Sequence, residues 1–357
     1  MSKSRRDARR WAGWSLRWQV LYKAKRAARR ARDAIKGFRR IGRPRRLVCG
    51  TYDKVLVIKI NHHHAGFFAY FLFALNQLRY CERHNYFPVV YFGEKSGNGF
   101  NAYFDRQHGE NMWDYYFEPV AGLRYTDIQC MVYDPQSGLR QEDLVELTAE
   151  DLWYLHLFDP ESIYGYTYGR YRHKREYDAD WYEAQRAKAR DCVDQYVRVR
   201  EPIRRIVDEF YDAHMDGCDV LGVHIRGTDK GAAVASSNVQ RIVGPEAYIT
   251  EIDKYLCEHP HCRIFLATDQ TQFLEMMKQR YADRLLYRDA KRSSSNLNPF
   301  QVQDGEGYRK GEDALVDCLL LSRCDFLLKC TSHLSETALY FNPDLKCLDL
   351  NYAERSL

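Results

Sequence analysis

The sequence predicts an α/β protein made of two Rossmann-like lobes with a cleft between them, preceded by a basic helical arm. Residues 47–215 and 216–357 each contain short apolar runs that alternate with helical patterns, which is typical of sheets covered by helices. A highly charged helical pattern over residues 178–215 separates the two series as an inter-lobe helix. Residues 1–46 hold 18 Lys and Arg against two acidic residues, so this arm differs sharply from the acidic remainder of the chain.

The arm is expected to form an amphipathic helix. Trp11, Trp14, Trp18, Leu21 and Tyr22 fall on one face at 100° per residue, and Arg and Lys fill much of the remaining surface. Such a helix can lie on an anionic membrane surface. The alternatives are a solvated basic tail and a helix docked on the protein's own surface. Nucleic acid is not an expected partner, because the rest of the chain is acidic and repels phosphate.

The cysteines indicate a reducing compartment. The 11 cysteines are scattered, and no C-x-x-C pair is present, which is typical of buried thiols in a cytosolic protein and of neither a zinc site nor a disulfide framework. We therefore expect a cytoplasmic protein that is peripheral on the inner membrane face if its arm binds lipid.

The first lobe begins with a β-loop-α-β unit. An apolar, β-branched run at Val55–Ile60 predicts a buried strand, and a polar loop containing His64 follows it. An aromatic-rich helix is predicted at Phe67–His84 and a second strand at Pro88–Phe92. Residues 93–175 are weakly periodic, which predicts shorter elements and loops.

The second lobe is predicted to continue with four strands and four helices in alternation. Its predicted strands are Asp219–Ile225, Arg263–Ala267, Asp325–Leu328 and Lys346–Leu350, and its predicted helices are Pro245–Cys257, Thr271–Tyr281, Gly311–Arg323 and Ser332–Phe341. Such a series predicts an open parallel sheet, whose ligands bind at the carboxyl ends of the strands.

Polar residues begin abruptly where the first strand of the second lobe ends. Arg226 offers a planar fork for phosphate oxygens, and Lys230 supplies a second, mobile cation. Gly227 permits close approach of the backbone, while Asp229 and His224 can hold the two cations in place. The segment therefore predicts a diphosphate site, with a surface turn of paired charges as the alternative.

Three further positions extend this predicted site. Asp269 follows Thr268 at the end of the second strand, where the pair either contacts ligand or caps the next helix. Thr331 and Ser332 precede a helix, where hydroxyls and free amides can bind an anion, and Ser332 is also a good N-cap. Asp317 lies among apolar residues and needs donors, which either a guanine ring or a buried arginine would supply.

In this order, these segments resemble the nodulation-type α1,6-fucosyltransferases and their relatives, the core fucosyltransferases and the protein O-fucosyltransferase superfamily. The resemblance covers the chain from about residue 219 onward. His224–Lys230 resembles the signature H-[VI]-R-R-T-D-K, and Leu266–Asp269 is similar to the A-T-D strand end. Asp317–Thr331 is similar to D-x₃-L-S-x-x-D-F-L-[VL]-C-T, with one extra residue before the cysteine.

The resemblance implies an inverting GT-B-type glycosyltransferase that binds a nucleotide sugar, with GDP-fucose the expected donor, in its C-terminal lobe and needs no metal. The acceptor would be a glycan, glycolipid or glycoprotein bound by the N-terminal lobe. The residues expected to take part in catalysis are Arg226, Lys230, Asp229 and His64. The residues expected to bind the donor are His224, Gly227, Thr228, Asp269, Asp317, Thr331 and Ser332.

Two departures from the family pattern bear on the donor and the base. Gly227 stands where the family has a second arginine, and Val234 stands where the core fucosyltransferases have a glutamate. The candidate bases are then His64, Asp105 and Glu110, all in loops of the first lobe. The two alternatives are a glycosyltransferase that uses another nucleotide sugar, such as a UDP-sugar, and a non-catalytic protein that binds nucleotide sugars or polyanions.

Overall fold

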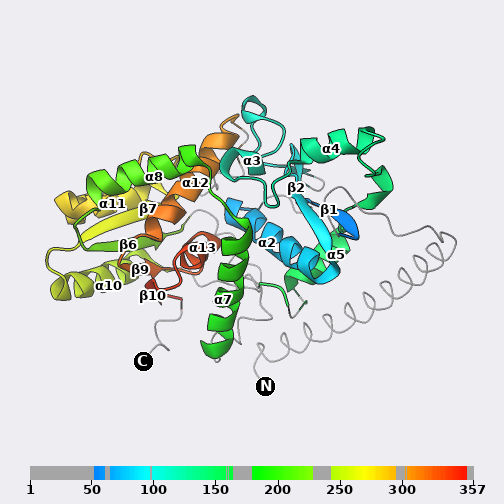
Figure 1. Ribbon diagram of the computed structural model, residues 1–357. Coiled ribbons are helices and arrows are strands. Elements are labelled where there is room, and N and C mark those ends of the chain that lie inside the picture. Colours follow the sequence, from blue (N-terminus) through cyan, green and yellow to red (C-terminus); the bar gives the residue numbers. More distant parts are fainter. Residues whose placement is uncertain are drawn as a thin grey trace, which may run out of the picture.

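The computed structural model describes most of the chain beyond the arm. The described residues are 52–60, 65–96, 99–157, 159, 161–163, 179–227, 243–294, 302 and 304–351. Figure 1 shows two groups of strands and helices side by side, with helix α7 (Ala179–Tyr196) at their junction. The basic arm lies outside the described residues, so the prediction of an amphipathic helix stays a prediction.

The N-terminal lobe is built on three parallel strands in the order β2-β1-β5. These are β1 (Lys54–Ile58), β2 (Tyr86–Val90) and β5 (Leu144–Val145). Helix α2 (Phe67–His84) packs on one face, and α4 (Tyr125–Tyr133) packs on the other through Ile128. The predicted α2 is confirmed to the residue, and it ends because Asn85 takes the left-handed conformation (φ 54°).

Short elements fill the rest of this lobe, as predicted for residues 93–175. They are β3 (Lys95–Ser96), β4 (Gly99–Phe100), α3 (Trp113–Tyr116), α5 (Ala149–Leu157) and the 3₁₀ turns Arg106–His108 and Gln141–Asp143. Many of the aromatic residues pack here: the Phe71 and Trp113 rings are stacked, and the Trp113 and Phe117 ring centroids lie 4.5 Å apart. This packing fixes the loops that face the second lobe.

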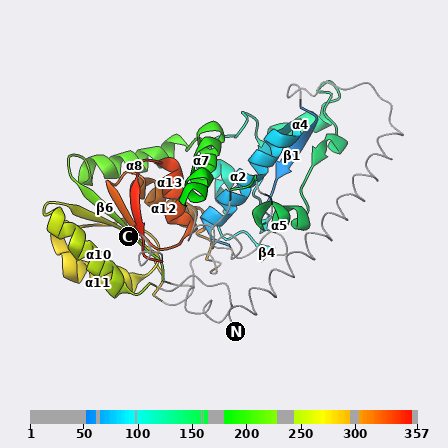
Figure 2. The same cartoon turned by 90° about the horizontal axis from the view of Figure 1, so that it is seen from below.

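The prediction of one inter-lobe helix over residues 178–215 is wrong, because this segment forms two helices. Helix α7 ends at Tyr196, and α8 (Glu201–His214) starts in a new direction after a short extended stretch. Pro202 lies in the first turn of α8, where its missing N–H costs nothing. Helix α7 packs on α2 of the first lobe and on α13 (His333–Phe341) of the second, as Figures 1 and 2 show.

The C-terminal lobe is a five-stranded parallel sheet in the order β10-β9-β6-β7-β8. The strands are β6 (Val220–Ile225), β7 (Arg263–Thr268), β8 (Leu285–Leu286), β9 (Phe326–Lys329) and β10 (Lys346–Asp349). Counted along the chain this is the order 3-2-1-4-5 of a doubly wound fold, with its switch point between β6 and β9. The four predicted strands are confirmed within two residues, and β8 was not predicted.

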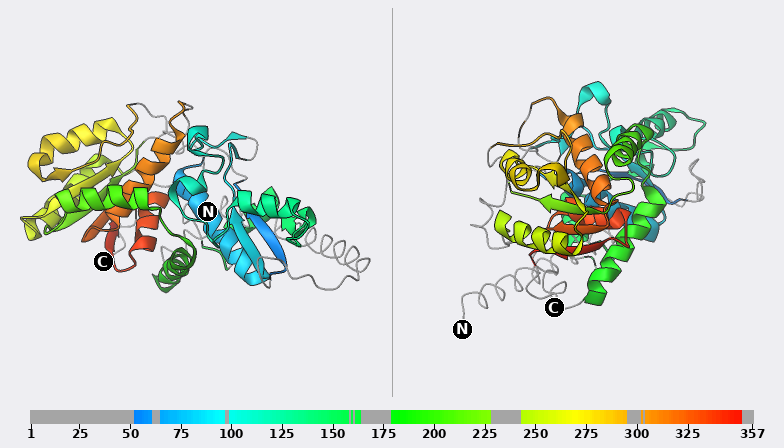
Figure 3. Two further views of the ribbon diagram at one scale, coloured as in Figure 1. Left: turned by 45° about the horizontal axis from the view of Figure 1, so that its top comes forward. Right: turned by 90° about the vertical axis from the view of Figure 1, so that its left-hand side faces the viewer.

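Helices cover both faces of this sheet, as the views in Figures 2 and 3 show. Helices α10 (Pro245–Glu258) and α11 (Thr271–Tyr281) pack on one face, where Tyr248 and Met277 are buried. Helices α8, α12 (Gly307–Leu321) and α13 pack on the other. The prediction placed the start of α12 at Gly311, four residues too late, because Gly307 and Gly311 suggest a break rather than a helix.

Those two glycines form the contact between α12 and the first lobe. A Cβ at Gly307 would lie 2.3 Å from the carbonyl oxygen of Phe104, and one at Gly311 would lie 2.2 Å from the Tyr116 hydroxyl. That hydroxyl donates a hydrogen bond to the carbonyl of Tyr308 at 2.8 Å, and the two rings stack. Because only hydrogen fits at both positions, α12 approaches the N-terminal lobe closely enough to form one continuous core.

Substitution of Gly311 with alanine is expected to destabilise the protein by about 1–2 kcal/mol, measured by urea unfolding. The steric cost exceeds the gain in helix propensity, which is at most about 1 kcal/mol. The loss should be smaller in a Tyr116→Phe background, because the clashing oxygen is gone. Equal losses in both backgrounds would show that the hydroxyl is not the obstacle.

Candidate functional site

Several of the predicted site residues of the second lobe lie at the carboxyl edge of its sheet. Arg226 and Gly227 follow β6, Asp269 follows β7, and Thr331 follows β9 one residue later. The Gly227 amide donates a hydrogen bond to Asp269 Oδ1 at 3.1 Å, which ties the ends of β6 and β7 together. This edge includes the switch point between β6 and β9, where open α/β sheets bind their ligands.

Arg226 brings this edge into electrostatic contact with the N-terminal lobe. Burial raises the pKa of the Tyr103 hydroxyl, and the charge of Arg226 opposes that rise. The Tyr103 hydroxyl accepts a hydrogen bond from the amide of Phe67 at 2.9 Å, at the first residue of α2. The partly exposed Arg226 is therefore near enough to the N-terminal lobe for its charge to influence the Tyr103 hydroxyl.

His224 lies below this edge within β6. Its side chain is buried, and its backbone carbonyl accepts a hydrogen bond from the Tyr248 hydroxyl at 3.1 Å. Alternation along the strand places His224 on the same face as Gly222, whose missing side chain makes room for Cys324. The imidazole thus belongs to the face of the sheet that α12 and α13 cover.

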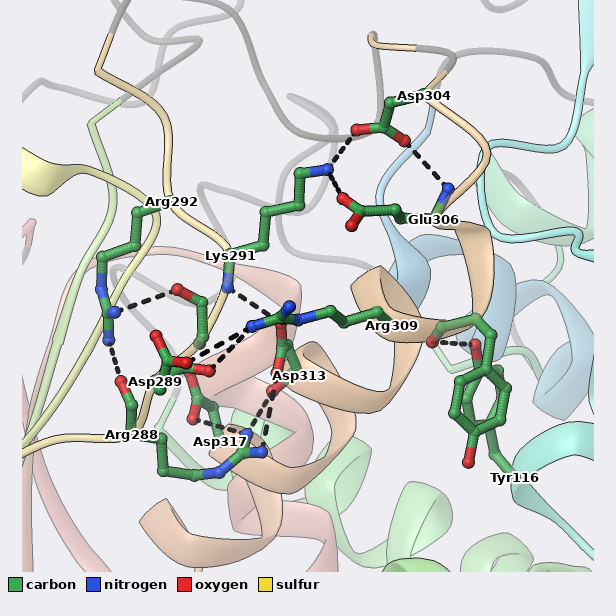
Figure 4. Close-up of polar contacts among 12 residues, drawn as sticks. Tyr116, Arg288, Asp289, Lys291, Arg292, Asp304, Glu306, Arg309, Asp313 and Asp317 are labelled. Carbon is green, nitrogen blue, oxygen red and sulfur yellow. Dashed lines mark hydrogen bonds and ion pairs between the residues drawn. The ribbon is translucent and has the colours of Figure 1, made fainter.

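Asp317 has the buried arginine partner that the sequence left as one of two alternatives. Arg288 Nη1 lies 3.4 Å from Asp317 Oδ1, and its Nη2 lies 3.6 Å from Asp313 Oδ1, one turn earlier on α12. Figure 4 shows the guanidinium reaching both carboxylates from the segment that follows β8. Burial raises the pKa of the Asp317 carboxyl to about 6, although the charge of Arg288 opposes the rise.

A second group of ion pairs holds the start of α12 beside this cluster. Lys291 pairs with Asp304 and Glu306, as Figure 4 shows, and Lys310 Nζ lies 2.6 Å from Asp304 Oδ1. These pairs hold Asp304 largely in its charged form, since they lower the pKa of its carboxyl to about 2 against the opposing effect of burial. They fasten the segment after β8 to the first turn of α12.

The stability of the protein should depend on pH through Asp317. As the pH falls, the Asp317 carboxyl binds a proton at a higher pH in the folded protein than in the unfolded chain, because its pKa is raised in the folded state. The buried charge of Asp317 therefore destabilises the protein above about pH 6, and this effect disappears as the pH falls. Between pH 7 and 5 the wild type should gain about 1 kcal/mol of unfolding free energy relative to Asp317→Asn. Urea unfolding of both proteins at the two pH values tests this, and a constant difference between them would contradict it.

Thr331 and Ser332 lie at the start of α13, and both are almost fully buried. The Thr331 amide donates to Asn351 Oδ1 at 2.7 Å, and its hydroxyl donates to Asp349 Oδ2 at 3.4 Å. Ser332 precedes the first helical residue without capping it through its side chain. The contacts of Thr331 therefore join the ends of β9 and β10.

Lys329, which is fully buried at the end of β9, is not among the predicted site residues. Its ammonium lies 3.0 Å from Glu336 Oε2 and 2.8 Å from Asp349 Oδ2. The Tyr182 hydroxyl of α7 donates to the other Glu336 oxygen at 2.5 Å. The sequence does contain a sign of this cluster, because Lys329 is the extra residue before Cys330 and directly follows an apolar strand. A lysine in such a strand requires buried partners for its charge.

Several predicted residues cannot be placed. His64, Thr228, Asp229 and Lys230 lie outside the described residues, as does Val234. Of the other candidate bases, Asp105 caps a 3₁₀ turn by accepting from the Gln107 amide at 3.1 Å, and it lies 3.2 Å from His108.

Two features are absent from the part of the chain that the structure describes. No group of three His, Cys, Asp or Glu side chains in that part is arranged to hold a metal ion. Within the same residues, no helix has both the length and the apolar character needed to cross a bilayer.

Comparison with known proteins adds a family match and a fold match. Residues 181–357 match the family model described as nodulation protein Z (NodZ). A crystal structure of NodZ α-1,6-fucosyltransferase soaked with GDP-fucose superimposes with a TM-score of 0.50 at 17% identity, covering 84% of this chain and 96% of that one. No curated protein matches the chain.

Two other solved structures are similar at lower scores. Fucosyltransferase NodZ from Bradyrhizobium has a TM-score of 0.46 at 16% identity, covering 81% of this chain and 92% of that one. POFUT1 in complex with GDP has a TM-score of 0.48 at 10% identity, covering 84% and 99%.

The NodZ match begins within α7 and includes the whole C-terminal sheet, with Arg226, Asp269 and Thr331 at its carboxyl edge and Asp317 within α12. The resemblance inferred from the sequence is thereby confirmed over this half of the chain, and the two-lobed fold agrees with the NodZ structure. The protein thus has the two-lobed fold of a fucosyltransferase structure, and its residues 181–357 resemble NodZ.

Proposed function

We propose that the protein transfers fucose from GDP-fucose to a hydroxyl of a glycan, glycolipid or glycoprotein, with inversion and without a metal. The observation that supports this most directly is the position of Arg226, at the carboxyl edge of the NodZ-like sheet. A NodZ structure was obtained with GDP-fucose, which supports the choice of donor. Inversion and metal independence are expected from the family resemblance.

The proposed reaction is a direct displacement at the anomeric carbon. The acceptor oxygen forms the new bond to this carbon as the bond to the diphosphate oxygen breaks, and its electron pair leaves with GDP. Arg226 would stabilise the charge that develops on the departing diphosphate. The start of α13, with Thr331 and Ser332, would add a positive helix end near the same edge. Lys230 would act as a second cation.

The proton of the acceptor hydroxyl must pass to a base from the N-terminal lobe. Asp105 and Glu110 are candidates among the described residues, and His64 is the third. Asp105 is two residues from Tyr103, which is near Arg226, and its side chain is 13% exposed. Substituting each candidate with its amide, or His64 with glutamine, and measuring transfer at saturating donor would identify the base by loss of kcat.

The donor and acceptor sides of the site would belong to different parts of the chain. In this proposal, residues 216–357 bind the nucleotide sugar and residues 47–215 bind the acceptor. The two separate parallel sheets support this division. The buried core continues from one lobe to the other through α2, α7 and α13. The proposed division therefore separates two binding roles and does not separate two hydrophobic cores.

The basic arm would hold a cytoplasmic enzyme at the inner face of a membrane, where lipid-linked or surface glycans are accessible. Its 18 basic residues and its tryptophans support this role. The full chain should sediment with anionic vesicles at low salt, and removal of residues 1–46 should abolish that binding while leaving donor hydrolysis intact. Full-length protein that stays in the supernatant would refute the membrane role.

The donor is tested by thermal shift with GDP, UDP, ADP, CMP and GDP-fucose in the presence of EDTA. A ligand that binds only the folded state raises the melting temperature. Selective stabilisation by GDP that is lost in Arg226→Ala is the expected result. Stabilisation by UDP would replace the donor, and binding of GDP-fucose without turnover of any acceptor or water would favour a non-catalytic binding protein. No shift with any nucleotide would refute the proposed donor site.

A further inference from the structure

Gly227 has no room for a side chain, because residues of the next βα unit occupy the space. A Cβ at this position would lie 2.3 Å from Gln270 Oε1, 2.8 Å from Gln270 Cδ and 2.5 Å from Cε2 of Phe273. An arginine at 227, as in the family signature, would have to displace both side chains. The glycine is therefore matched to its neighbours across the strand ends.

The side-chain amide of Gln270 forms no hydrogen bond within the described residues, although the residue as a whole is largely buried. Gln270 is 8% exposed, and within the described residues its hydrogen bonds are all made by its backbone. Its amide donates to the Thr268 hydroxyl at 3.3 Å, its carbonyl accepts from the Leu274 amide at 3.4 Å, and it pairs with Ser293 as an isolated bridge. Neither polar atom of the carboxamide is fully buried, so both remain open to a partner from solvent. Such a group at a ligand-binding edge indicates a partner that arrives with the ligand.

The surroundings of Gln270 select the kind of partner. The carboxamide touches Gly227, the residue directly after Arg226, at the edge where the diphosphate is proposed to bind. Asp269 already accepts the Gly227 amide, so that amide is not available to a phosphate. A glutamine side chain carries two N–H donors, and phosphate oxygens accept such hydrogen bonds strongly.

We propose that Gln270 is a donor-binding residue whose carboxamide donates a hydrogen bond to the diphosphate held by Arg226. This assignment rests on the proposed function and makes it more specific. Gln270 takes the place of the second arginine both in space and in function: it fills the volume above Gly227 and supplies a neutral N–H donor where the family supplies a charged one. The site consequently has one arginine and one amide for the diphosphate.

The test is Gln270→Met, measured by the Kd for GDP and the KM for GDP-fucose in the full-length protein. Methionine has a similar length and fills the same space but cannot donate a hydrogen bond. We expect GDP affinity to fall about tenfold, which is the typical effect of losing a hydrogen bond to a charged group. The melting temperature without ligand should stay nearly unchanged, because methionine fills the same space and no side-chain hydrogen bond is lost.

Two variants make the result specific. Gln272→Met is the matched control, because Gln272 lies two residues after Gln270 and its exposed side chain donates to the Ser294 carbonyl at 2.7 Å. The GDP affinity of this variant should change less than twofold. Arg226→Ala reports on the site itself. Wild-type affinity in Gln270→Met together with weakened binding in Arg226→Ala would overturn the assignment while the proposed function stands. Absence of GDP binding by the wild type would overturn both.

Discussion

Replacement of Arg226 with alanine is expected to lower kcat/KM for fucosyl transfer by about 10²–10³-fold, because a preorganised donor to the developing negative charge is lost. The unfolding free energy should change by less than about 1 kcal/mol, since the guanidinium is half-exposed at the strand end. The measurement is a steady-state assay with GDP-fucose and a suitable acceptor, or donor hydrolysis when the acceptor is not known. Arg226→Lys should also be impaired, because an ammonium cannot replace the bidentate fork.

The control for Arg226 is Arg205→Ala on α8. Arg205 is exposed, and its ion pairs within the described residues are with Glu201 and Glu209 at 3.8 and 4.0 Å, so its removal tests the effect of losing one positive charge from the protein. Its kcat/KM should remain within twofold of wild type. Equal losses in the two variants would mean that the general field of the protein, rather than contact with the diphosphate, causes the effect.

Replacement of Lys329 with methionine is expected to lower the unfolding free energy by about 3–5 kcal/mol. The substitution leaves the carboxylates of Glu336 and Asp349 buried without their shared cation, and a buried charge without a countercharge is among the costliest changes in a protein. Urea unfolding measures the loss. The double variant Lys329→Met/Asp349→Asn should recover part of it, because one of the two orphaned charges is also removed.

Lys59→Met provides the comparison on the surface. Lys59 follows β1 and pairs with Glu146 at 2.6 Å, but the two side chains are 30% and 51% exposed. Its removal should cost under about 1 kcal/mol. A similar loss in the two lysine variants would contradict the view that burial, rather than pairing as such, makes Lys329 important.

The helices and strands were largely predictable because each depends on its own residues. Helix α2 and helix α11 match their predicted bounds, since apolar spacing and end residues determine both. The strands β5 and β8 have two residues each and carry no detectable period. They exist because a neighbouring strand offers free backbone groups, which a single segment cannot reveal.

The site was predictable as an edge and not as a set of contacts. Parallel strands end on one side of a sheet, so Arg226, Asp269 and Thr331 could be grouped from their positions alone. The partnership of Arg288 with Asp317 depends on a segment after β8 whose course no local pattern defines. The match between Gly227 and Gln270 likewise depends on how closely two strand ends pack.

The position of α7 has a practical consequence for anyone who divides the protein. Ala189, Cys192 and Val193 are buried in the core that α7 shares with α2, and the Cys192 thiol lies 3.7 Å from the carbonyl of Leu75. A fragment that starts at residue 181, where the family match begins, would retain α7 and lose the helix that shields it. Such a fragment would expose an apolar stripe to solvent and should aggregate on expression, so the NodZ-like half is not an independently folding unit.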